Sequence, residues 1–173
     1  QLAALSATNF SALDATQAAG LTTTQIGALS ATTLRGLTAT DVTEFSATQV
    51  GVLSASQIGA LSATSLSGLD ETAIGTFSTT QIKGITTTQI AGLSTTDVGE
   101  FTATQIGAFA TTQIAALGPT NIGALSTTQI GGLTTTQIAA LSATNLSALD
   151  ATQVDVLSTT QIGALTTTQL KNL

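Results

Sequence analysis

Apolar side chains recur along this chain at two fixed places in an eight-residue period. From Leu5 to Asn172 the sequence consists of 21 consecutive octads of the form L-[S/T/D]-[A/T]-T-Q-[I/V/L]-x-[A/G], without insertion. Position one is Leu, Phe or Ile throughout, and position six is almost always Ile, Val or Leu. A repeat this short cannot close a core by itself, so neighbouring octads must bury these side chains against one another.

Incomplete octads flank the array at both ends. Gln1 to Ala4 fill positions five to eight of a leading octad, and Leu173 opens a trailing one. We therefore expect residues 1–173 to form one octapeptide-repeat solenoid that is a segment of a longer array. Two, three or four octads per superhelical coil would each satisfy the pattern, and the handedness of the coil stays open.

The polar positions favour helices over strands. Position two is Ser, Thr or Asp in 19 octads, the exceptions being Ala110 and Gly118, and these side chains cap the N-termini of helices. Three residues later stands Gln in 13 octads, which completes a capping box such as Ser78 with Gln81. The sequence thus predicts an all-α solenoid or superhelix with one very short helix per octad, although Thr and Ile would also suit the alternative, a β-solenoid.

Two further features agree with helices. Positions one and six fall at N′ and N4, the pair that forms a hydrophobic staple, as Leu125 and Ile130 would. The only proline, Pro119, falls at the first helical position, where a missing N–H costs nothing. Fifteen of the 16 glycines lie at positions seven or eight, but some octads have none there, so the next N-cap residue is expected to make the turn.

Position four is the most uniform position, with Thr in 20 octads and Ser56 in the other. Because position two already supplies the cap, we expect these hydroxyls to form a buried ladder that bonds open carbonyls at neighbouring bends. The alternative is an exposed threonine array that binds an ordered surface such as ice or a polysaccharide. Its candidate surface-binding residues are Thr24, Thr88 and Thr136.

The acidic and aromatic residues are predicted to be structural. Asp14, Asp70 and Asp150 stand at position two, where a carboxylate both caps the helix and meets its positive end. The Gly-Gly-x-Gly-x-Asp spacing of calcium-binding nonapeptides is missing, so calcium is a weak alternative. The five Phe residues all fall at positions one or six and are expected in the core.

Composition excludes several function classes. The chain has no His, Cys, Tyr, Trp or Met, and 7% of its residues are charged, so the usual general bases, soft metal ligands and thiol nucleophiles are missing. We expect no enzyme activity, no catalytic residue, no cofactor and no metal site. With three basic and nine acidic residues and no apolar run of roughly 20 residues, we expect no nucleic-acid partner and no membrane insertion.

Runs such as LSTTQIGALTTTQ (157–169) and ITTTQIAGLSTTD (85–97) resemble the Thr- and Gln-rich octapeptide arrays of very large bacterial surface or secreted proteins, adhesin-like or RTX-like in organisation. The resemblance implies an extended stalk or spacer at the cell surface or in the extracellular space. Its partners would be the neighbouring repeats of the same array, with a glycan or ice surface as the alternative.

Overall fold

The chain is all-α, as the capping pattern predicted. A computed structural model describes residues 6–171, and within them it contains 21 short helices and no strand. Each helix lies in one octad, and all but one begin at position three of it. The β-solenoid alternative is therefore wrong.

The chain divides into two compact units, Gln1–Gly92 and Leu93–Leu173. The described helices of the first unit are α1 (Ala7–Phe10), α2 (Ala15–Ala19), α3 (Thr23–Gly27), α4 (Ala31–Arg35), α5 (Ala39–Thr43), α6 (Ala47–Gly51), α7 (Ala55–Ile58), α8 (Ala63–Ser67), α9 (Glu71–Gly75), α10 (Thr79–Gly84) and α11 (Thr87–Ala91). Those of the second unit are α12 (Thr95–Gly99), α13 (Ala103–Ala108), α14 (Thr111–Ala116), α15 (Gly118–Gly123), α16 (Thr127–Gly131), α17 (Thr135–Ala140), α18 (Ala143–Leu146), α19 (Ala151–Asp155), α20 (Thr159–Gly163) and α21 (Thr167–Leu170).

Local capping explains where the helices begin, except for α14 and α15, which have no side-chain cap. The N-cap side chain at position two accepts the N3 backbone N–H, while the Gln at N3 accepts the N-cap N–H, as Thr86 and Gln89 do at the start of α11. Asp14, Asp70 and Asp150 are N-caps too, as predicted. These reciprocal bonds satisfy N–H groups that have no partner within a helix.

The bend between helices is made by the N-cap residue, as predicted. Thr86, for example, is extended, with φ −78° and ψ 155°. The glycines at positions seven and eight do not use the left-handed conformation, since Gly118 is the one described residue with positive φ, at +70°. Regular helical geometry in α15 therefore starts at Pro119, whose fixed φ suits the first turn.

Positions one and six form the apolar core of each unit. Ile26, Ile82, Ile106 and Ile138 are fully buried, and position-one side chains such as Leu53 are nearly so. The five phenylalanines are buried as well, and Phe10 packs edge-on against Phe45 with ring centroids 5.4 Å apart. The predicted apolar seam is therefore present in both units.

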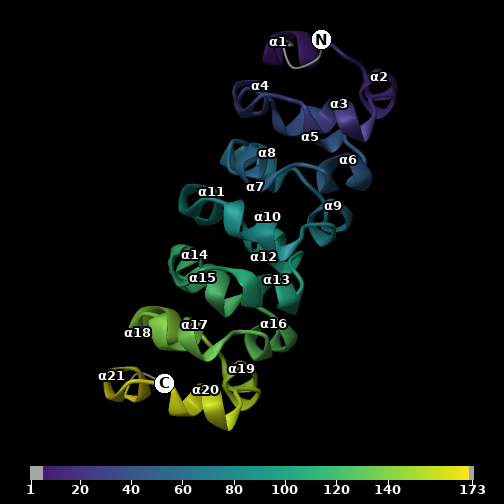
Figure 1. The fold of residues 1–173 in the computed structure, drawn as a ribbon. Helices are drawn as coiled ribbons and strands as arrows, with labels where there is room; N and C mark the ends of the chain where they lie inside the picture. The colour runs from purple at the N-terminus through teal and green to yellow at the C-terminus, as the bar shows by residue number, and fades with distance from the viewer. Residues whose placement is uncertain (1–5, 172–173) are drawn as a thin grey trace. The chain divides into compact units, whose positions relative to one another are not determined.

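Within each unit, the helices that pack against one another lie three octads apart along the chain. In the first unit α5 packs against α8 and α7 against α10, and in the second α13 packs against α16 and α15 against α18. Figure 1 shows the helices stacked in successive layers within each unit. One coil thus contains three octads, and helices n and n+3 form a column. Of the two, three or four octads per coil that the sequence allowed, the structure has three.

Position-five glutamines join one coil to the next. Gln137 donates from Nε2 to the carbonyls of Phe109 at 2.7 Å and Ile106 at 2.9 Å, which lie 28 and 31 residues earlier. Its Oε1 simultaneously accepts the Thr134 N–H at 2.7 Å. The same arrangement, with acceptors 28 and 30 or 31 residues back, is formed by Gln49, Gln57, Gln81, Gln89, Gln129, Gln153, Gln161 and Gln169. We call this set the glutamine ladder.

Candidate surface-binding face

The position-four hydroxyls lie on the surface. All 21 of them, twenty threonines and Ser56, are exposed in the structure. The predicted buried threonine ladder is therefore wrong. Successive side chains of a helix are separated by about 100°, so a helix that turns positions five and six inward directs position four outward.

The side chains that donate to open carbonyls of a neighbouring coil are the position-five glutamines, and not the position-four threonines as predicted. The capping box uses only Oε1 of the glutamine, so that interpretation left its two Nε2 hydrogens unexplained. A five-residue helix also leaves carbonyls open at its end, and these need donors. The sequence signal for this role was at position five, where every octad except the one with Ala73 has a side chain that forms hydrogen bonds: Gln, Asn, Asp, Ser or Thr.

The candidate threonines do not share one column. Thr24 is on α3, which packs against α6, whereas Thr88 is on α11, which packs against α8. These two residues thus belong to different columns of the first unit. Thr136 is on α17 of the second unit, where it is exposed beside exposed Thr135.

One column of the second unit presents hydroxyls without any charge. Helices α14, α17 and α20 pack in succession, and their octads, 109–116, 133–140 and 157–164, contain no charged residue. Their position-four side chains, Thr112, Thr136 and Thr160, are all exposed. The other two columns of this unit each carry acidic residues, such as Asp97 and Asp150. We call the α14, α17 and α20 face the neutral threonine column.

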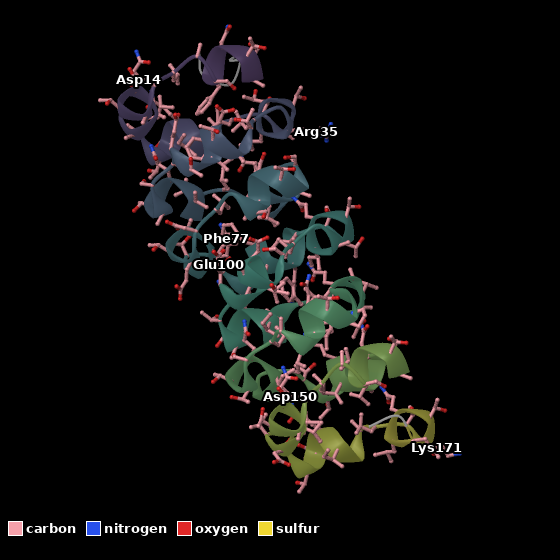
Figure 2. The ribbon with its side chains drawn as sticks, turned by 180° about the vertical axis from the view of Figure 1, so that it is seen from behind. Asp14, Arg35, Phe77, Glu100, Asp150 and Lys171 are labelled. Atoms are coloured by element: carbon pink, nitrogen blue, oxygen red, sulfur yellow. The ribbon has the colours of Figure 1, made fainter. Side chains whose placement is uncertain are left out.

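The charged residues are structural or solvent-facing. Figure 2 shows Arg35 and Lys171 pointing away from the ribbon, whereas Phe77 lies among the helices. Asp41 is buried at N3 of α5 and accepts the Thr38 N–H and the Ser11 hydroxyl, each at 2.7 Å. Burial alone would raise the pKa of Asp41, but these hydrogen bonds hold that pKa below its usual value.

Asp150 is an exposed N-cap. Its Oδ1 accepts the Thr152 hydroxyl at 2.6 Å and the Gln153 N–H at 2.8 Å. These two hydrogen bonds lower the pKa of Asp150, because they stabilise the ionised carboxylate. Within residues 6–171 no group of three or more His, Cys, Asp or Glu is placed to hold a metal ion. None of the described helices has the length and apolar character needed to span a membrane.

Comparison with known proteins identifies a tandem repeat. Residues 106–143 and 139–167 match the ALTTAQ repeat, so this part of the second unit is similar to a recognised repeat family. The class is therefore a helical tandem-repeat solenoid. No curated protein and no solved structure matches the chain.

Proposed function

We propose that this chain is a structural spacer from a large bacterial cell-surface or secreted, adhesin-like protein, and that it has no catalytic role. The glutamine ladder is the observation that carries this proposal. It repeats the same three hydrogen bonds from coil to coil in both units and does not converge on a single site.

A spacer needs coils that can be added without changing the contacts of the existing ones. Each ladder glutamine donates hydrogen bonds to the preceding coil through Nε2 and accepts one from its own N-cap through Oε1, as Gln137 does. Stability in such an array is a sum of repeat and nearest-neighbour terms, so its length can change while its packing does not. Neighbouring repeats are the partners that this design requires.

Small-angle scattering on chains of different length tests the proposal. A copy of residues 125–148 inserted after Ala148 adds one coil and preserves the octad register. We expect the maximum dimension to increase by about 8–10 Å, the distance between packed helices. Calcium should not change the melting temperature. An unchanged maximum dimension, or stabilisation by calcium, would contradict the spacer.

A second candidate, binding to an ordered surface of ice or polysaccharide, is favoured by the neutral threonine column. Hydroxyls there recur once per coil on stacked helices, about 8–10 Å apart, and no charge interrupts them. Such a face could meet a surface whose own groups are regularly spaced. This function would replace the passive role of the spacer in the second unit.

Threonine-to-valine changes separate the two candidates. The triple variant Thr112→Val, Thr136→Val, Thr160→Val removes three hydroxyls and keeps the shape of the side chains. The matched control alters Thr104, Thr128 and Thr152 on α13, α16 and α19. Thermal hysteresis at ice crystals, or glycan binding, that is lost only in the first variant would support surface binding. If the unaltered chain shows neither thermal hysteresis nor glycan binding, this candidate is ruled out.

A further inference from the structure

The octad 69–76 is the one octad of the array whose position-five side chain cannot form a hydrogen bond. Ala73 stands where the flanking ladder members place glutamine. Applying the ladder offsets of 28 and 31 residues to Ala73 gives Phe45 and Val42. The carbonyls of these two residues are therefore those that a glutamine at position 73 would bond.

A cavity of about 60 Å³ lies at this place in the first unit. Its lining consists of Val42, Thr43, Phe45, Gly68, Leu69, Asp70 and Ala73. The two expected acceptor residues and the N-cap of α9 are thus all part of its wall. Asp70 and Thr43 are exposed, so the cavity reaches the surface.

The polar groups of the wall are those that bind the glutamine amide elsewhere in the array. In the octad 85–92, Gln89 donates to the carbonyls of Leu61 and Ile58, both at 2.8 Å, and accepts the N-cap N–H. At Ala73 no described donor bonds the Phe45 carbonyl, and no described acceptor bonds the Asp70 N–H. The Val42 carbonyl accepts the Phe45 N–H, at 3.2 Å, and the Glu44 N–H. The Val98 carbonyl accepts the equivalent N–H groups of Phe101 and Glu100 and still accepts Gln129 Nε2 at 2.9 Å, so these two N–H groups do not prevent an amide from binding.

We propose that this cavity binds a primary carboxamide. The ligand oxygen accepts the Asp70 N–H, and its NH₂ group donates to the carbonyls of Phe45 and Val42. The ligand thus reproduces the three bonds of a ladder glutamine, while Leu69 and the Phe45 ring contact its alkyl end.

Other small ligands match the wall less well. A carboxylate has no donor for the two carbonyls, and an ammonium group has no acceptor for the N–H. A hydroxyl has one donor for two carbonyls. A water needs a cavity of only about 10–15 Å³, so one water leaves most of this volume and its apolar wall without contact.

Nuclear magnetic resonance titration of the full chain tests the site. Propionamide is added to ¹⁵N-labelled protein, and 2-butanone, which has a similar shape but no N–H donor, is the control ligand. We expect saturable shifts of the Ala73, Phe45 and Asp70 amide signals with propionamide, and at least tenfold weaker binding of 2-butanone. Shifts that do not saturate, or equal binding of both compounds, would overturn the proposal.

Two variants make the test specific. Ala73→Gln supplies the amide covalently and should abolish the propionamide response. Gln137→Ala creates the same kind of cavity in the second unit and should produce a new response at the Thr134 and Phe109 amides. A propionamide response at Phe45 that persists in Ala73→Gln would overturn the proposal, and this comparison holds even if Gln137→Ala does not fold.

A further arm identifies the source of the amide. N-acetylglutamine N-methylamide carries one primary carboxamide on a peptide-like backbone. Tighter binding of this compound than of propionamide assigns the site to a glutamine side chain of a partner, and the reverse order assigns it to a free small amide. Binding of neither compound would overturn the proposal.

Discussion

Replacing Gln137 by Ala should weaken the second unit more than any surface change near it. The variant loses the Nε2 bonds to Ile106 and Phe109 and the Oε1 bond to the Thr134 N–H. The site at Ala73 shows that alanine at this position accompanies a cavity of about 60 Å³. At about 24 cal/mol per Å³ such a cavity costs about 1.4 kcal/mol. The Ile106 carbonyl keeps the Phe109 N–H, but the Phe109 carbonyl and the Thr134 N–H lose their partner. These two groups add about 1–2 kcal/mol each, for a total of about 3–5 kcal/mol.

Hydrogen exchange under increasing urea measures this loss locally. We expect faster exchange in α13, α14 and α17, which the Gln137 bonds connect, and little change in the first unit, because stability in repeat arrays is transmitted mainly between neighbours. Thr136→Ala is the matched control, since its side chain is exposed and should change stability by less than about 0.5 kcal/mol. If the two variants lose the same stability, the glutamine ladder does not hold the coils together.

Three other predictions follow from the contacts. A Cβ on Gly84 would overlap backbone atoms of the preceding coil, so Gly84→Ala should lower the free energy of unfolding by about 1–3 kcal/mol. A Cβ on Gly75 would meet no atom within 4 Å, so Gly75→Ala should raise that free energy by up to about 1 kcal/mol. Urea unfolding measures both changes. Ala110 gives no side-chain cap to α14, so Ala110→Ser should raise the melting temperature and add about 1 kcal/mol. Because the pKa of Asp41 is lowered in the folded state, its contribution to stability should be constant above about pH 5 and disappear as pH falls below about 4. An Asp41→Asn variant should lack this part of the acid transition.

The helices were predictable because their determinants lie within one octad. A capping box links residues three apart, as Ser78 and Gln81 do, and needs no knowledge of the coil. The phase of the apolar positions likewise depends only on helical periodicity. At Ala110 the N-cap side chain cannot accept a hydrogen bond, yet α14 still forms. The Ala110 N–H donates to Gln113 Oε1, and the Ile114 side chain is fully buried.

The coil contacts were not predictable by the same argument. The bonds of the ladder span 28 and 31 residues, and no rule of local sequence gives those offsets. Without them, the uniform threonine is the predicted donor to the open carbonyls, and the capping box accounts for the glutamine through its Oε1 alone. The cavity at Ala73 was hidden for the same reason, since the residues opposite it, Val42 and Phe45, could be named only after the coil was known.

The packing of the position-eight glycines depends on the number of octads per coil, which the octad pattern alone does not reveal. Position-eight glycines contact position-three alanines 29 residues earlier, as Gly132 does with Ala103 and Gly92 with Ala63. A Cβ on Gly132 would lie 2.8 Å from the Ala103 carbonyl oxygen, which leaves no space for a side chain. The small pair therefore has to be kept three octads apart. Adding 24 residues preserves such pairs, whereas adding eight places each glycine against a different octad. The repeat visible in the sequence has eight residues, but the unit that conserves the packing has 24.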